Sequence, residues 1–157
     1  MQFVESVRRT TITTNKIAES LRFYGDCVGM KIWYDGTIHD PQVSELFGLL
    51  PQTATRVVIL HSEQNYTAGM IGLMEFPGEQ IAEMPRINSK TPLAGEVVIM
   101  ITAVNIMKLH ERLIEFSFEI IAPPVRLQIP NRACVYEMMT RDPNGVRVTF
   151  AQQGEIE

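Results

Sequence analysis

The stretch IAESLRFYGDCVGMKIW, residues 17–33, contains most of a helix, its end and the start of a strand. Apolar side chains recur at spacings of three and four residues, which predicts a helix with one buried face. Gly29 is well placed to end this helix, because glycine readily adopts the left-handed conformation that follows a last helical turn. Residues 31–35, KIWYD, then predict a short strand. The apolar stripe consists of Ile17, Leu21, Tyr24 and Val28.

The elements around this stretch occur in the same order twice. In the first half we expect a strand, a helix capped by Asn15, three strands and a short helix inside a long loop. In the second half we expect a strand, a helix capped by Thr102, and three strands, the last two joined by the turn DPNG. The expected ranges are 9–14, 15–28, 31–35, 43–50, 56–62 and 69–76, and then 96–102, 103–116, 118–124, 133–140 and 146–153.

This internal repeat predicts two modules that share one structural domain. The first module covers residues 1–80 and the second covers residues 95–157. Residues 81–94 between them are rich in proline, glycine and polar side chains, which is typical of a linker. The predicted fold class is α+β, with two βαβββ modules forming a cupped mixed sheet and the helices outside.

Three stretches resemble the vicinal oxygen chelate superfamily, which includes glyoxalases, bleomycin resistance proteins and extradiol dioxygenases. IAESLRFYGDCVGMKIW is similar to the first helix and second strand of that family. GEVVIMITAVNIMKLHERL resembles the strand and helix that open its second module, and TRDPNGVRVTFAQ resembles its closing hairpin. The resemblance covers nearly the whole chain and implies the glyoxalase/bleomycin-resistance fold.

Composition narrows the range of partners. The formal net charge of −4 argues against a nucleic-acid-binding protein, which needs a basic face. No apolar run approaches the roughly 20 residues that cross a bilayer, and the first residues lack the pattern of a signal peptide. Cys27 and Cys134 form neither a metal-type pair nor a disulfide framework, so we expect packed thiols. A cytoplasmic protein without nucleic-acid or membrane partners is expected.

The resemblance also implies where a divalent metal would be held. Relatives that use a metal take one ligand from the first strand and one from the last strand of each module. Of the matching positions only Glu96 offers a metal ligand, because a protonated arginine has no lone pair and glycine has no side chain. We therefore expect no metal and no cofactor, and a metal-dependent glyoxalase or dioxygenase only if this register is wrong. The matching positions are Arg9, Gly72, Glu96 and Thr149.

Arg9 and Glu96 take corresponding positions in this register, which predicts an ion pair between them. The pair has two open roles: it fills the vacated metal site, or its guanidinium holds an anionic ligand through two hydrogen bonds. Strand alternation points Arg8 to the opposite face.

Other residues on the same strands are candidates for contact with a small molecule. Gly72 leaves room above the sheet for a flat ligand, while Met74 and Met100 supply adaptable apolar surface. Alternation turns one of Trp33 and Tyr34 inward, where an aromatic ring can stack on a ligand. Filling of the core is the alternative role for all four of these larger side chains.

Two functions remain open at this point. The first is a protein that binds a small aromatic or anionic molecule in the cupped sheet without a metal. The second is an enzyme of the same superfamily, a lyase, isomerase, hydrolase or dioxygenase-like protein, in which Arg9, Glu96 or His39 transfers a proton. Because family members commonly pair, we also expect a homodimer.

Overall fold

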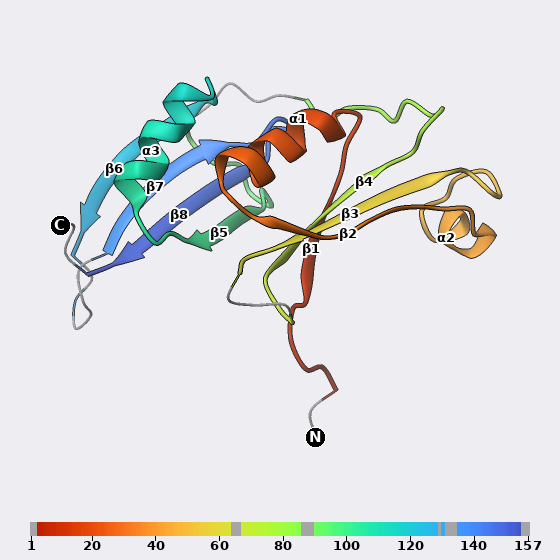
Figure 1. Ribbon diagram of the computed structural model, residues 1–157, viewed down its shortest axis with the longest axis horizontal. Helices are drawn as coiled ribbons and strands as arrows, with labels where there is room; N and C mark the ends of the chain where they lie inside the picture. Colours follow the sequence, from red (N-terminus) through yellow and green to blue (C-terminus); the bar gives the residue numbers. More distant parts are fainter. Residues whose placement is uncertain (1–2, 64–66, 86–89, 129, 131–134, 155–157) are drawn as a thin grey trace. The chain divides into compact units, whose positions relative to one another are not determined.

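A computed structural model describes residues 3–63, 67–85, 90–128, 130 and 135–154. The chain divides into two compact units, Met1–Glu83 and Met84–Glu157. Each unit contains one four-stranded mixed sheet. The boundary between them falls inside the expected linker 81–94. The units are described one at a time below, with the labels of Figure 1.

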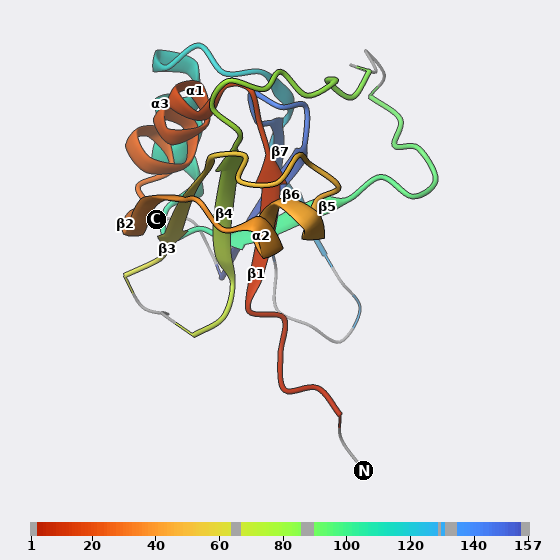
Figure 2. The ribbon, with the colours of Figure 1, turned by 90° about the vertical axis from the view of Figure 1, so that its right-hand side faces the viewer.

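The first unit has the sheet order β1-β4-β3-β2, in which β1 and β4 are parallel and the other neighbours antiparallel. One helical segment connects β1 to β2, and a short helix lies in the loop before β3. The elements are β1 (Arg9–Thr13), α1 (Ile17–Leu21), the π-helical turn η1 (Arg22–Cys27), β2 (Lys31–Ile38), α2 (Pro41–Leu46), β3 (Thr55–His61) and β4 (Met70–Glu75). Figure 2 shows the residues before β1 extending away from this sheet.

The helix of the first unit differs from its prediction at the start and along its length. Asn15 does not cap it: the Asn15 side chain donates to the Ile81 carbonyl at 2.7 Å and accepts from the Ile81 N–H at 3.3 Å. The Lys16 N–H instead donates to Thr14 Oγ1. The second half is a π-helix, which propensity does not reveal. The predicted end is confirmed, since Gly29 has a φ of 89°.

Both faces of the two central strands of the first sheet, β3 and β4, are buried. One face packs under α1 and η1, where Phe23 and Tyr24 meet edge to face at 4.8 Å between ring centroids. The other face has its own apolar cluster, against which Ile38, Leu49 and Ile81 pack. The near-continuous apolar sequence of β3 and β4 is explained by this two-sided burial. The second cluster consists of Val57, Ile59, Met70, Met74 and Phe76.

The second unit repeats this topology with the sheet order β5-β8-β7-β6. Again the outer strand β5 and its neighbour β8 are parallel. Asn105 caps α3 by accepting from the Lys108 N–H at 2.9 Å, so the predicted cap Thr102 is wrong. The elements are β5 (Val98–Thr102), α3 (Ile106–Glu115), β6 (Ile120–Leu127), β7 (Val135–Arg141) and β8 (Arg147–Gln153).

The hairpin between β7 and β8 closes as predicted. Asp142 Oδ1 accepts from the N–H groups of Asn144 and Val146 at 2.9 and 2.8 Å. Gly145 has a φ of 89°, which a residue with a side chain rarely adopts. Because the turn fixes the pairing of its strands, this local chemistry sets the register of β8.

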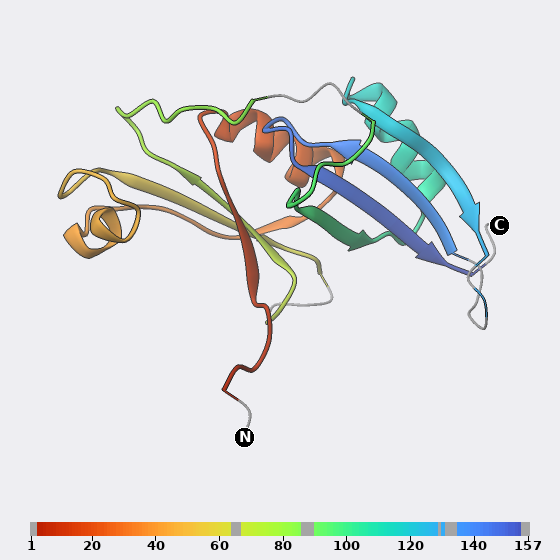
Figure 3. The same cartoon turned by 180° about the vertical axis from the view of Figure 1, so that it is seen from behind.

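In the second unit α3 covers one face of the sheet. Its own residues Ile106 and Leu113 are fully buried. Figure 3 turns the opposite face toward the viewer, and no helix covers it within the described part of this unit. We call this surface the open face. The segment before β5 crosses it near β8 (Figure 3).

Two of the expectations from composition can be compared with the structure. No helix among the described residues is long and apolar enough to cross a membrane. Cys27 is buried within η1, as expected of a packed thiol, while Cys134 lies outside the described residues. The fold class is confirmed, since each unit has the βαβββ order.

Candidate functional site

Arg9 lies on the outer strand of the first sheet, with its side chain across Gly72. The parallel pairing places Thr11 beside Gly72, and Arg9 is on the same face as Thr11. Arg9 Nε donates to Thr11 Oγ1 at 3.0 Å. A Cβ added at Gly72 would lie 2.8 Å from Arg9 Cδ and 3.0 Å from Arg9 Nε. Gly72 therefore allows the arginine stem to lie flat on the strand.

This arrangement corrects one sequence prediction. Gly72 was expected to leave room for a flat ligand, but the Arg9 side chain occupies that space. The missing Cβ instead positions the guanidinium group. Since Nε is used by Thr11, the two terminal nitrogens remain able to donate to a ligand. Among the residues that the structure describes, Thr11 is the only side chain bonded to Arg9, and no carboxylate pairs with it.

The register of the second unit changes the assignment of Glu96. Met100 pairs with Thr149 as Thr11 pairs with Gly72. Val98 pairs with Arg147 as Arg9 pairs with Met70. The residue equivalent to Arg9 is thus Val98, and the predicted correspondence between Arg9 and Glu96 is wrong by two residues. Glu96 precedes β5. Its match to Arg9, placed directly after Gly95, was misleading, because two more residues lie between Glu96 and the start of α3 than between Arg9 and the start of α1.

Glu96 takes its partners from its own unit. Its Oε1 accepts from Arg147 Nε at 2.7 Å and from Arg141 Nη1 at 3.2 Å. Its Oε2 accepts from the Leu93 N–H at 3.0 Å. The Leu93 hydrogen bond first, and then the two guanidinium groups, hold the pKa of Glu96 below its ordinary value of 4.5. The carboxylate therefore stays ionised at neutral pH.

Arg147 joins this carboxylate to the segment before β5. Its side chain is only 1% exposed, and it donates to the carbonyls of Lys90 and Thr91 at 3.1 and 3.2 Å. Sequence analysis missed Arg141 and Arg147 as the partners of Glu96. Their spacing in the closing hairpin was a usable signal, because antiparallel pairing across the DPNG turn places them side by side. We call Glu96, Arg141 and Arg147 the ion cluster.

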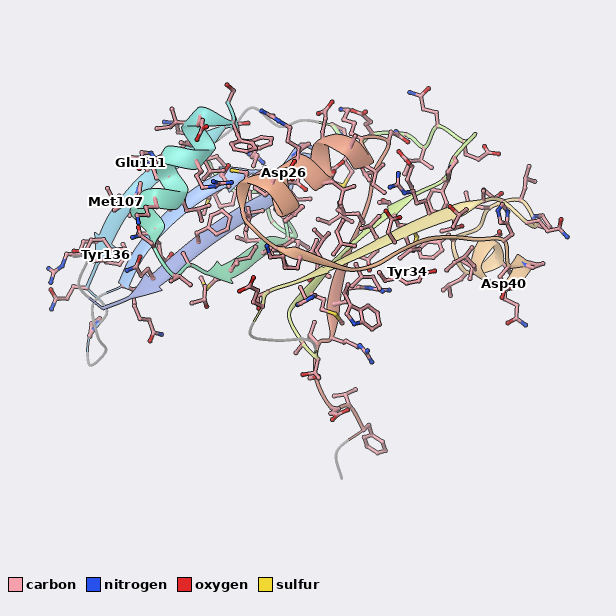
Figure 4. All side chains as sticks on the ribbon, viewed as in Figure 1. Asp26, Tyr34, Asp40, Met107, Glu111 and Tyr136 are labelled. Carbon is pink, nitrogen blue, oxygen red and sulfur yellow. The ribbon has the colours of Figure 1, made fainter. Side chains whose placement is uncertain are left out.

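The aromatic candidates lie at a β-bulge in β2. The pairing with β3 shifts between Ile32 and Tyr34, so simple alternation does not hold at Trp33. Tyr34 pairs with Ile59 and lies against Gly36, while Trp33 is 52% exposed. Figure 4 shows Tyr34 on β2. Of the two rings, Tyr34 is the one placed on the Ile59 face.

The two candidate methionines have opposite environments. Met74 is buried in the apolar cluster of the first unit, where it contributes to the core. Met100 is 64% exposed on the open face of the second unit, and Thr149 beside it is buried. His39 is exposed in the turn between β2 and α2, and it has no bonded partner within the described ranges. None of the described residues bonds to His39 in a way that would orient it for proton transfer.

The model of the Glyoxalase/Bleomycin resistance protein/Dioxygenase superfamily matches residues 6–150. The chain belongs to this superfamily. No curated protein sequence was found to match the chain. The predicted resemblance is therefore confirmed at the level of the superfamily.

Solved structures support the same fold at low sequence identity. A glyoxalase family protein from Bacillus cereus is 14% identical, with a TM-score of 0.71, over 99% of this chain and 97% of that chain. A glyoxalase I mutant from Zea mays is 14% identical, with a TM-score of 0.68, over 96% of this chain and 45% of that chain. TnmS3, an antibiotic binding protein from Streptomyces sp. CB03234, is 15% identical, with a TM-score of 0.59, over 98% of this chain and 100% of that chain.

The metal used by some superfamily members does not fit the donors present here. The four strand positions hold Arg9, Gly72, Val98 and Thr149, and none of these is a ligand that anchors a divalent ion. Glu96 has both oxygens occupied by N–H donors. No group of three or more His, Cys, Asp or Glu side chains that could hold a metal occurs in the described part of the chain.

Proposed function

We propose that this superfamily member binds a small aromatic molecule that carries an anionic group, and that Arg9 holds the anion. The observation that carries the proposal is the guanidinium group of Arg9. It is exposed, fixed by one bond from Nε to Thr11, and without a carboxylate partner among the described residues. An arginine in this state can give two parallel hydrogen bonds to a carboxylate, phenolate or phosphate.

The local geometry favours recognition over a purely structural role for Arg9. A structural arginine is paired with a carboxylate, as Arg147 is with Glu96 in the second unit. Arg9 instead has a glycine beneath its stem and a threonine hydroxyl that orients its Nε. These contacts reduce the number of conformations of the side chain before a ligand arrives, which lowers the entropic cost of binding.

The relatives are consistent with a binding function. TnmS3 is described as an antibiotic binding protein, and its whole length is matched by this chain. The likeness shows a shared fold and supports the proposal only in that this fold serves for binding small molecules. The chemical class proposed here rests on Arg9.

The enzyme alternative has less support. Proton transfer by Glu96 requires a carboxylate that changes protonation near neutral pH, whereas three N–H donors hold its pKa below 4.5. His39 remains a possible acid or base only as a sequence prediction. We therefore place the enzyme second to the binding protein. Homodimer formation also stays a prediction, which analytical ultracentrifugation would check.

The test is a ligand screen followed by matched arginine variants. Aromatic acids, phenols and glutathione conjugates are screened by thermal shift, and each hit is titrated calorimetrically. Arg9→Ala is expected to weaken binding by about tenfold or more, because a hydrogen bond to a charged group contributes about 1.5–3 kcal/mol. Arg9→Lys should restore only part of the affinity, since lysine cannot give the two parallel bonds.

Arg8→Ala is the matched control. It removes an equal charge one residue away, and alternation directs that side chain to the opposite face of β1. The ligands found in the screen should bind to Arg8→Ala as tightly as they bind to the unchanged protein. If Arg9→Ala left the affinity of every hit intact, the proposal would be rejected.

A further inference from the structure

The open face of the second unit contains a carboxylate that the proposed anion site does not use. Glu137 lies in the middle of β7, between Val125 of β6 and Ala151 of β8. Alternation places it opposite Met138, which is buried beneath α3. Glu137 is therefore on the open face that Figure 3 turns toward the viewer.

Apolar side chains flank this carboxylate along its own strand. Val135 and Met139 are its same-face neighbours along β7 and are half-buried. Exposed apolar side chains stand on both outer strands of the sheet, on either side of the Glu137 position. They are Val98 and Met100 on β5, and Val125 and Leu127 on β6.

Glu137 is half-buried and makes no hydrogen bond or ion pair among the described residues. The nearby arginines on this face, Arg141 and Arg147, are committed to Glu96. A carboxylate in apolar surroundings is costly without a partner, and a cation with N–H donors compensates that cost. The charge of Glu137 therefore specifies which ligands suit this face.

We propose that the open face binds an organic amine with an apolar or aromatic body, and that Glu137 is the counter-ion of its ammonium group. The body lies on Met139 of β7 and extends across β8 toward Met100 of β5, where burial of apolar area contributes affinity. The ammonium donates to the Glu137 carboxylate. Every residue that this site uses belongs to the second unit, whereas Arg9 belongs to the first.

The test uses two probes of equal shape and different charge, 1-naphthylmethylamine and 1-naphthalenemethanol. Binding to the full chain is followed at pH 7 by chemical-shift changes in the isotopically labelled protein. The amine should bind about tenfold more tightly than the alcohol, which is the ratio expected of one charge-assisted hydrogen bond. The shifts should map to β5, β6 and β7.

Three variants complete the design. Glu137→Gln should reduce amine binding to that of the alcohol, while Glu111→Gln, on the outer surface of α3 (Figure 4), should change neither. Met100→Gln should weaken both probes, because it removes apolar contact and no charge. Arg9→Ala should leave the affinity for the amine unchanged. A failure of the amine proposal can therefore be distinguished from a failure of the anion site at Arg9.

Two outcomes would overturn the proposal. The first is equal affinity of amine and alcohol, or an amine affinity that Glu137→Gln leaves unchanged in a variant with the same circular dichroism spectrum. The second is a shift from dimer to monomer in Met100→Gln, which would make the open face an interface between copies of this chain.

Discussion

Arg8 and Arg9 are neighbours in the sequence, but the structure gives them different surroundings. Arg9 lies across Gly72 and bonds to Thr11, whereas Arg8 contributes its carbonyl to the Met70 N–H. Period-two alternation was enough to separate the two side chains. It could not show that the Arg9 stem occupies the space above Gly72, because that depends on a rotamer and on the pairing of β1 with β4.

Gly72→Ala provides a direct test at the scale of one residue. The new Cβ would meet Arg9 Cδ at 2.8 Å and Thr11 Oγ1 at 3.0 Å, so the arginine has to leave its place. Because the displaced atoms belong to a flexible side chain and alanine is better than glycine in a strand, stability should change by less than about 1 kcal/mol. Affinity for anionic ligands should fall nearly as far as in Arg9→Ala.

Thermal unfolding and calorimetric titration of Gly72→Ala, Arg9→Ala and the double variant separate these effects. The double variant should bind no more weakly than Arg9→Ala alone, because both changes act on one guanidinium group. Additive losses would mean that Gly72 contributes in a way other than by positioning Arg9.

At the scale of elements, the strands were predictable and the helix starts were not. Each strand was found to within a few residues, because apolar and β-branched side chains mark strands directly. Asn15 and Thr102 were chosen as caps by residue type, but Asn15 bonds to Ile81 and Asn105 caps α3. The match of Glu96 to Arg9 failed for the same reason, since it was placed directly after Gly95 and not counted back from the helix cap.

The two arginine–carboxylate pairs should differ in their effect on stability. Arg56 bonds to Asp35 through both Nε and Nη2 at about 3 Å, but the two side chains are 34% and 38% exposed. Arg147 is buried and also holds two backbone carbonyls. Arg147→Met should cost about 3 kcal/mol, whereas Arg56→Met should cost less than about 1 kcal/mol.

Urea unfolding of the two variants gives both values under the same conditions. Arg56→Met is the control, because it makes the same chemical change in a pair that is more exposed. Equal costs for the two substitutions would show that the ion cluster does not fix the segment before β5. A small cost for Arg147→Met together with a lower m-value would instead show that Arg147 does hold this segment, since a loosened segment exposes surface before unfolding.

At the scale of the whole molecule, the family resemblance predicted the fold because the order of elements is a property of the entire chain. The candidate site was predicted only in part. Met100 pairs with Thr149 as Thr11 pairs with Gly72, whereas the partners of Glu96 depend on contacts between segments about 50 residues apart in sequence. Such contacts leave no periodic signal in the sequence.

The acid stability of the molecule follows from its lowered carboxyl pKa values. The pKa of Asp35 is lowered first by its hydrogen bonds to Arg56, and the pKa of Glu96 first by the Leu93 N–H. A group whose pKa is lower in the folded state stabilises the fold above its unfolded pKa and loses that effect as pH falls. Stability should therefore be constant near neutrality and decline below the ordinary values of 3.8 and 4.5.

Glu96→Gln tests the contribution of Glu96. The variant should be less stable than the unchanged protein at pH 7, and the difference should shrink as the pH falls below 4.5, where Glu96 of the unfolded chain takes up a proton before Glu96 of the folded protein does. Urea unfolding of both proteins at pH 7, 5 and 3.5 measures this difference in stability. A difference that is independent of pH would show that charge is not what Glu96 contributes.

The parallel pairing of β1 with β4 has a consequence for the newly made chain. Strand β1 ends at Thr13 and β4 at Glu75, so β1 leaves the ribosome about 60 residues before its partner strand in this unit is complete. At the usual rate of synthesis this delay is on the order of 3–12 s. During it β2 and β3 can form their hairpin, and β1 remains exposed to chaperones and proteases. The strand that carries Arg9 is thus among the first parts of the unit to be made and the last to be placed.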